Sequence, residues 1–177
     1  MPDSEKHADS TMGISLCRSR PDDLVFLYQV YASSRAEEMA LLVDWDDAQK
    51  EEFLRFQFKA QHTHYQEHYP NARYDLIMQN GEAIGRLYIE RMENEIRLMD
   101  IALLPQYRNQ GIGRALMQDV LDEARDTGKF VSLHVEEVNP ARRLYERMGF
   151  LVKGDVSFYK LMHWIPVGLN PVYVTGK

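Results

Sequence analysis

Residues 106–116 have the sequence QYRNQGIGRAL, and this stretch decides the fold. It joins an apolar, strand-like segment to a long helical pattern. The first turn of a helix leaves backbone N–H groups without partners and carries a partial positive charge. Gly111 and Gly113 would let a ligand approach the backbone closely because glycine has no Cβ. An ordinary glycine-rich turn is the alternative, but the strand before it and the helix after it favour a phosphate or pyrophosphate site, to which Arg108 and Arg114 would add charge.

Two familiar nucleotide motifs do not fit this loop. The Walker pattern needs a lysine followed by serine or threonine after its last glycine, whereas Arg114 and Ala115 follow Gly113. The dinucleotide fingerprint needs a third glycine where Leu116 stands, and the first half of the chain is not a strand–helix–strand unit. Neither familiar nucleotide motif therefore identifies the anion, and a phosphate-binding domain that uses another nucleotide stays open.

Size and composition narrow the class of protein. The chain has 177 residues and a formal net charge of −6, which fits one domain and argues against nucleic acid as the main partner. The single cysteine, Cys17, lies in an alternating strand-like run and excludes an internal disulfide framework. No apolar run approaches the roughly 18 residues of a membrane helix, and residues 1–12 have the composition of a flexible polar leader. We expect a cytoplasmic protein without a membrane partner.

The order of the predicted elements is strand, helix, helix, three strands, helix, strand, helix and two strands. The strands are expected at residues 14–20, 73–78, 83–91, 95–104, 130–135, 150–152 and 156–162, and the helices from 21 onward and at 46–68, 111–127 and 140–148. This order predicts an α+β fold with a mixed, mostly antiparallel twisted sheet of about six or seven strands flanked by about four helices. We expect one domain at 13–164, followed by an irregular tail at 165–177.

Two segments resemble a known family. RNQGIG at residues 108–113 resembles the Arg/Gln-x-x-Gly-x-Gly/Ala signature of the GNAT superfamily of N-acetyltransferases, and NPARRLYERMGF at 139–150 resembles its second cofactor-binding segment. The resemblance covers residues 14–163 in element order and is most specific over 101–150. It implies the acyl-CoA N-acyltransferase fold, with a splayed central strand pair, and acetyl-CoA as the co-substrate.

The resemblance also implies where the cofactor lies. The pyrophosphate would rest on the backbone amides of residues 108–113, and the pantetheine arm would pair like an extra strand with the backbone of Ile101 and Leu103. Asn139 would either contact the cofactor or cap the helix that follows Pro140. The complete set of expected cofactor-binding residues is Ile101, Ala102, Leu103, Arg108, Asn109, Gln110, Gly111, Ile112, Gly113, Arg114, Asn139 and Arg142.

Catalytic roles follow from the same resemblance. Tyr145 stands at the position of the family's usual general acid, although a tyrosine packed in the core beside Leu144 is the alternative. The N–H of Leu103 would donate to the oxyanion. Arg97 stands where many relatives carry a glutamate, so the base is open among Glu90, Asp100, Glu136, His134 and an ordered water chain. No metal is expected, because no cysteine or carboxylate cluster accompanies His62, His64 and His68.

The implied activity is transfer of the acetyl group of acetyl-CoA to a primary amine of a small molecule or peptide by direct attack. An acetyl-CoA-binding regulatory module without turnover is the alternative, because no base is obvious. The acceptor would depend on the first two helices, the turn at residues 154–157 and the tail. Glu37 and Glu38 are either part of the acceptor wall or a solvated turn. Members of the family often dimerise through their last strands, so a homodimer is one assembly that the resemblance allows.

Overall fold

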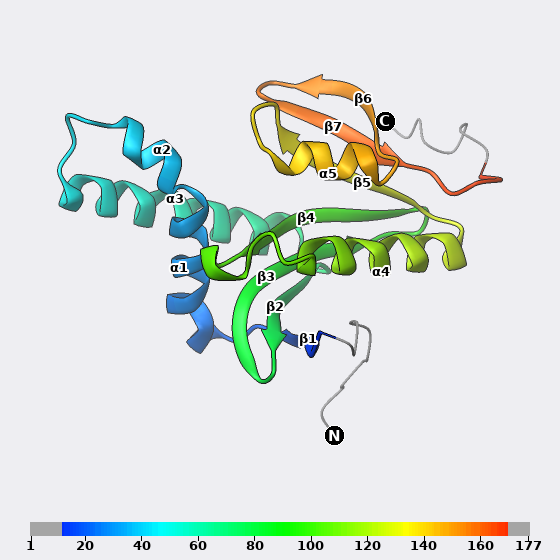
Figure 1. The fold of residues 1–177 in the computed structure, drawn as a ribbon, viewed down its shortest axis with the longest axis horizontal. Helices are drawn as coiled ribbons and strands as arrows, with labels where there is room; N and C mark the ends of the chain where they lie inside the picture. Colours follow the sequence, from blue (N-terminus) through cyan, green and yellow to red (C-terminus); the bar gives the residue numbers. More distant parts are fainter. Residues whose placement is uncertain (1–11, 170–177) are drawn as a thin grey trace.

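The computed structural model describes residues 12–169. Its strands form a single seven-stranded sheet in the order β1-β2-β3-β4-β5-β7-β6 (Figure 1). The strands are β1 (Ile14–Arg18), β2 (Arg73–Gln79), β3 (Glu82–Arg91), β4 (Glu95–Leu103), β5 (Phe130–Glu136), β6 (Leu151–Val156) and β7 (Tyr159–Trp164). Only the β4–β5 pair is parallel. The predicted fold class is therefore confirmed.

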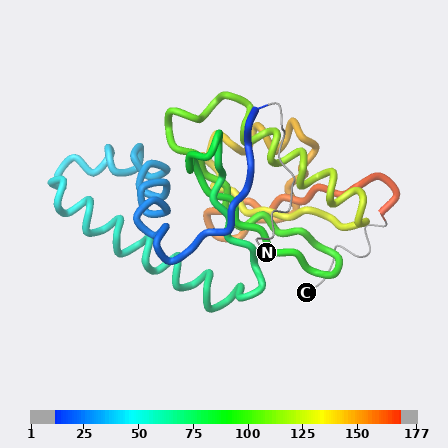
Figure 2. Tube along the Cα trace, turned by 90° about the horizontal axis from the view of Figure 1, so that it is seen from below, coloured from blue at the N-terminus to red at the C-terminus, as the bar shows by residue number. Residues whose placement is uncertain are grey.

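Helices cover both faces of this sheet. They are α1 (Leu24–Ser34), α2 (Ala36–Leu41), α3 (Asp47–His68), α4 (Ile112–Thr127) and α5 (Ala141–Arg147), with 3-10 turns η1 (Pro21–Asp23) and η2 (Pro105–Tyr107). Figures 1 and 2 show α3 along one face and α4 along the opposite face. No helix within residues 12–169 has the length and apolar character needed to cross a membrane.

The two faces of the sheet belong to two separate hydrophobic cores. Leu76 and Tyr88 pack with side chains of α1 and α3, such as Leu27 and Phe58. On the opposite face, residues one position away along the same strands, Ile77 and Leu87, pack with α4 and α5. Successive strand residues point to opposite faces, so each central strand contributes to both cores. These strands are therefore apolar on both sides, as the sequence indicates.

Two local features differ in detail from expectation. Glu37 and Glu38, for which the acceptor wall and a solvated turn were the alternatives, lie in the short helix α2, which is anchored by the buried Met39. The turn expected at residues 154–157 is shorter, because the last hairpin turns at Ser157, which has a φ of 57°. Gly154 lies inside β6, where the register with β7 shifts. A glycine in a strand commonly marks such a bulge.

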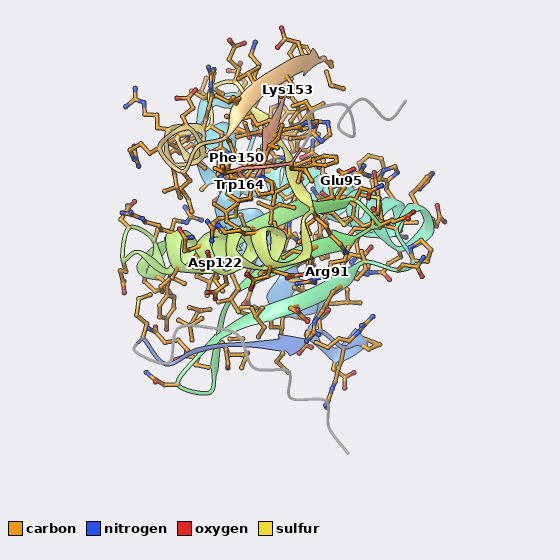
Figure 3. All side chains as sticks on the ribbon, turned by 90° about the vertical axis from the view of Figure 1, so that its right-hand side faces the viewer. Arg91, Glu95, Asp122, Phe150, Lys153 and Trp164 are labelled. Atoms are coloured by element: carbon orange, nitrogen blue, oxygen red, sulfur yellow. The ribbon has the colours of Figure 1, made fainter. Side chains whose placement is uncertain are left out.

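The end of α5 is fixed by aromatic packing. Gly149 has a φ of 94° and turns the chain toward Phe150, whose amide donates to the carbonyl of Tyr145 at 3.0 Å. Figure 3 shows Phe150 and Trp164 close together above α4, and the Arg125 guanidinium lies 5.6 Å from the Trp164 ring centroid. The Tyr145 ring lies 5.8 Å from that of Phe150. These contacts hold the side chain of Tyr145 against the sheet.

Candidate active site

The parallel strands β4 and β5 pair over only part of their length. Their register begins with Glu95 opposite Phe130 and ends with Leu98 opposite Leu133. Both strands continue beyond this pair, to Leu103 and Glu136, and they diverge as they do so (Figure 1). The predicted splayed pair is confirmed.

A β-bulge lies where the strands part. Along β4, Leu98 is opposite Ile89 and Asp100 is opposite Tyr88, so Met99 is an extra residue in the ladder. A bulge bends its strand and increases the local twist. The bulge therefore gives a physical cause for the departure of β4 from β5.

A small cavity of about 90 Å³ lies between the diverging strands. Its walls come from β4, β5, the loop before α5 and α5 itself. The lining residues are Leu98, Met99, Asp100, Ile101, Leu133, His134, Val135, Asn139 and Tyr145. It brings together five residues named as site candidates from the sequence, namely Ile101, Asn139 and Tyr145 and the candidate bases Asp100 and His134.

The backbone of β4 presents free hydrogen-bonding groups to this gap. The Leu104 amide donates to the Ile84 carbonyl at 2.9 Å, and Leu103 is opposite Gly85 in the antiparallel ladder. Hydrogen-bonded and non-hydrogen-bonded pairs alternate in such a ladder. The N–H groups of Leu103 and Ile101 therefore point away from β3, toward the side that β5 has left.

The loop before α4 is an array of unused donors. Gly111, at the N-cap of α4, has a φ of 83°, and Asn109 has a φ of 60°. Within the described part of the chain, the amides of residues 109–114 donate to no acceptor, whereas the amide of Arg108 donates to the Pro105 carbonyl at 3.2 Å. The donors expected from the sequence are thus present, with the Arg108 amide already occupied.

The two loop glycines face open space. A Cβ built on Gly111 or Gly113 would have no protein atom within 4 Å. Packing therefore does not require either residue to be glycine, although the left-handed backbone at Gly111 favours it. The space beside Gly113 instead suits a ligand that approaches the backbone.

The side chain of Arg108 stabilises this loop through two hydrogen bonds. Its Nε donates to the Leu103 carbonyl at 2.8 Å, and its Nη2 donates to the Ser33 hydroxyl at 3.1 Å. Gln110 donates from Nε2 to the Gln106 carbonyl at 2.6 Å. The exposed Arg114 forms no ion pair among the described residues. Arg108 therefore connects the loop to β4 and α1, while Arg114 remains available to an anion.

Asn139 caps α5 and also lines the cavity. Its Oδ1 accepts a hydrogen bond from the Ala141 amide at 2.9 Å. This contact is of the helix-capping kind, although Pro140 is the residue at the N-cap of α5. It leaves Nδ2 unused, so the cofactor contact stays a prediction. Arg142 forms an ion pair with Glu146 at 2.9 Å on the same helix.

Tyr145 is almost fully buried, with 6 % of its surface exposed, and lines the cavity. Burial raises its pKa to about 12, and the negative charge of Asp100 acts in the same direction. Its hydroxyl is therefore protonated at neutral pH, as a general acid must be. The packing alternative is not exclusive, because the ring also belongs to the α4–α5 core.

The candidate bases differ in whether they line the cavity. Arg97 forms ion pairs with Glu95 at 3.1 Å and Glu90 at 3.6 Å, which leaves Glu90 engaged away from the cavity. Asp100 and His134 line the cavity, and burial lowers the pKa of His134.

Glu136 lies at the end of β5. It forms an ion pair with Arg35 at 3.1 Å and accepts a hydrogen bond from the Tyr159 hydroxyl at 3.4 Å. Arg35 also pairs with Glu38 of α2 at 2.6 Å. Arg35, immediately before α2, thus contacts Glu136 at the end of β5, 101 positions away in the sequence.

Two residues near the cavity were not recognised from the sequence as parts of a site. Arg86 forms an ion pair with Asp100, and Tyr159 contacts Glu136. Tyr65 was expected in the core, with a place in the acceptor pocket as the alternative, and its hydroxyl donates to the carbonyl of Met99 at 3.4 Å. Arg86 gave one signal, because it is a charge inside the apolar run AIGRLYI. His64 and His68 stack at 4.2 Å, but no group of three potential metal ligands occurs within residues 12–169.

Comparison with known proteins agrees with this geometry. The model of the acetyltransferase (GNAT) family matches residues 26–150, and the chain belongs to this family. Among solved structures, the PaiA N-acetyltransferase from Thermoplasma acidophilum in complex with coenzyme A has a TM-score of 0.66 at 18 % identity, over 87 % of this chain and 99 % of that one. Spermidine N-acetyltransferase from Vibrio cholerae, in complex with CoA and spermine, has a TM-score of 0.58 at 18 % identity, over 86 % and 95 %. At such identity these likenesses show the fold.

Sequence relatives match a shorter region. The [ribosomal protein bS18]-alanine N-acetyltransferase of Haemophilus influenzae is 33 % identical over 75 residues, which are 42 % of this chain and 51 % of the relative. Streptothricin acetyltransferase from Streptomyces lavendulae is 41 % identical over 68 residues, 37 % of this chain and 36 % of the relative. The chain thus spans about half the length, or less, of these relatives.

Proposed function

We propose that the chain is an N-acetyltransferase that transfers the acetyl group of acetyl-CoA to a primary amine. One observation carries the proposal. The unused amides of residues 109–114 lie in the loop that follows β4, at the end of the strand where β4 has parted from β5. A diphosphate on these amides would lie beside the strand that can pair with an extended, amide-containing arm. Family membership supports the same assignment.

The donor would be held mainly by backbone groups. The amides of Asn109, Gln110, Gly111, Ile112, Gly113 and Arg114 would bind the pyrophosphate, with further charge from the Arg114 side chain. Ile101 and Leu103, on either side of Ala102, would pair with the pantetheine arm. Asn139 Nδ2 would contact its distal part, and Arg142 lies on the helix that follows.

The reaction would need few protein groups. The amine nitrogen attacks the thioester carbonyl carbon, the new C–N bond forms, and the C–S bond breaks. The Leu103 N–H would donate to the oxyanion. Tyr145, kept protonated by burial, would give its proton to the departing thiolate.

The acceptor would enter from the side of α1, α2 and the start of β7. Glu38 and Glu136, both paired with Arg35, and Tyr159 would line this entrance, and the excess of carboxylates over arginine would attract an amine. Relatives include enzymes named for a ribosomal-protein alanine and for spermidine. We therefore propose a peptide or small-molecule amine as acceptor, in a cytoplasmic setting, without a nucleic-acid partner.

Release of free thiol from acetyl-CoA in the presence of an amine panel tests the proposal. The panel should contain peptides with N-terminal alanine, linear polyamines and aminosugars, and mass spectrometry should detect one added acetyl group. Calorimetry with coenzyme A measures donor binding separately. Binding without turnover would favour the regulatory module, whereas absence of binding would overturn the donor assignment.

A further inference from the structure

A buried arginine lies beside the proposed acceptor side of the cavity. Arg86, on β3, has only 3 % of its surface exposed, and its Nη2 contacts a carboxylate oxygen of Asp100 and the Gln61 side chain, the latter at 3.1 Å. Its guanidinium lies 5.1 Å from the ring centroid of Tyr88 and 5.7 Å from that of Tyr31. Four side chains from α1, α3, β3 and β4 thus surround one guanidinium.

The bulge at Met99 decides where Asp100 points. Met99 packs in the core formed by α1 and α3, and the next residue, Asp100, reaches Arg86 in the same region. In a regular strand, adjacent side chains point to opposite faces. The extra residue in the ladder therefore allows both side chains to lie toward α3.

Asp100 is shared between the buried arginine and the cavity. Its Oδ2 atom is buried against Arg86, but the side chain as a whole keeps 21 % of its surface exposed. Asp100 lines the cavity together with Tyr145, and its charge raises the pKa of the Tyr145 hydroxyl in addition to the larger effect of burial. The remaining carboxylate oxygen is thus available on the side of the reacting groups.

Stability alone gives this arrangement little advantage. Removing two charges from water is costly, and apolar residues of similar volume often replace buried ion pairs without loss of stability. Arg86 nevertheless lies among aromatic rings that could pack against an apolar side chain. The other ionisable groups facing the pair come from α1, α3, β3 and α5. Arg86 contributes to the pKa shifts of Tyr31, His62, Tyr65 and Tyr88, and Asp100 contributes to that of Tyr145.

We infer that Asp100 accepts a hydrogen bond from the acceptor amine and that Arg86 is the positioning residue that holds this carboxylate in place. The inference rests on the proposed acetyltransferase function. The amine would donate one N–H to Asp100 and direct its lone pair at the thioester carbon. After attack, the proton lost by nitrogen passes to water, and the thiolate takes its proton from Tyr145.

The test compares Asp100→Asn with Asp75→Asn. Asp75 is also buried and also pairs with an arginine, Arg73 at 2.7 Å, but it lies on β2 away from the cavity. We expect Asp100→Asn to lower kcat/KM for the amine by about ten- to hundredfold, because a hydrogen bond to a charged group is lost. The dissociation constant of coenzyme A should stay unchanged, and Asp75→Asn should lower the unfolding temperature without this kinetic effect.

Arg86→Lys keeps the charge but loses the planar fork. We expect it to raise KM for the amine and to change the pH profile of kcat/KM, while KM for acetyl-CoA stays constant. Asp100→Glu should restore part of the activity lost in Asp100→Asn. Wild-type turnover matched by folded Asp100→Asn would overturn this inference alone, whereas no wild-type turnover on any amine would overturn the acetyltransferase proposal and this inference with it.

Discussion

Leu98 of β4 and Leu133 of β5 are the last residues that face each other before the two parallel strands part. Both are buried in the core beneath α4 and α5. On one side of this pair the strands form a ladder, and on the other side they line the cavity with Asp100, Ile101 and Tyr145. The same two strands therefore supply both a stable core and the walls of the site.

Gly113→Glu should separate stability from donor binding. A Cβ at this position would meet no protein atom within 4 Å, and glutamate favours the helix over glycine by up to about 1 kcal/mol. We therefore expect an equal or higher unfolding temperature but about tenfold or more weaker binding of coenzyme A, because the carboxylate repels a pyrophosphate at the proposed site. Calorimetry and thermal unfolding measure the two effects.

Gly154→Glu is the matched control for this substitution. Gly154 is also surrounded by open space, but it lies in β6, outside the loop. The affinity of this variant for coenzyme A should equal that of the wild type. Wild-type affinity in Gly113→Glu would contradict the placement of the pyrophosphate.

Tyr145→Phe should slow chemistry without weakening donor binding. The ring can still pack on Phe150, but the proton donor is removed. General-acid catalysis typically contributes 10²–10⁴-fold, so we expect kcat to fall by about 10²-fold or more. Tyr74→Phe is the control, because this buried hydroxyl donates to the carbonyls of Tyr65 and Tyr69 in the other core. A Tyr145→Phe enzyme with wild-type kcat would remove Tyr145 from the mechanism.

Arg108→Lys should show whether Arg108 acts through its hydrogen bonds to the loop surroundings or only through its positive charge. Lysine keeps the positive charge but cannot reproduce both side-chain contacts, to Leu103 and Ser33. Loss of one hydrogen bond costs about 1 kcal/mol, so we expect about fivefold weaker coenzyme A binding as the loop loosens. Arg114→Lys, at an exposed position, should bind normally. Equal effects at the two positions would show that Arg108 acts by charge.

Stability should fall at alkaline pH, between 10 and 12. Burial raises the pKa of Tyr88 and of Tyr145 from 10.0 to about 12. The folded chain therefore keeps these protons in a range where the unfolded chain releases them, and this difference favours unfolding. Urea denaturation across that range measures the loss, and Tyr88→Phe should reduce its slope. A free energy of unfolding that stays constant up to pH 12 would contradict the burial of these hydroxyls.

The backbone preferences of single residues were sufficient to predict most of the helix ends and turns of the fold. Gly128, with a φ of 66°, ends α4 as expected, and Asn80 and Gly81, both with positive φ, turn the β2–β3 hairpin. These signals depend on one or two residues whose backbone preferences are strong. The loop at Gly111 and Gly113 was recognisable for the same reason.

Long-range features could not be predicted in this way. The contact between Arg86 and Asp100 depends on the pairing of β3 with β4 and on the single extra residue at Met99, which has no sequence signature. The short helix α2 depends on burial of Met39, which only tertiary packing reveals. The proposed acceptor side of the site consists largely of such features, whereas the proposed donor side consists of local ones.

The division of the interior into two cores has an evolutionary consequence. Leu27 and Phe58 hold α1 and α3 on one face of the sheet, whereas Leu116 and Val120 hold α4 on the other. Mutations that reshape the first face can accumulate without disturbing contacts on the second. Under the proposed function, such a scaffold would acquire a preference for new amines step by step, while binding of the common acetyl donor is inherited unchanged.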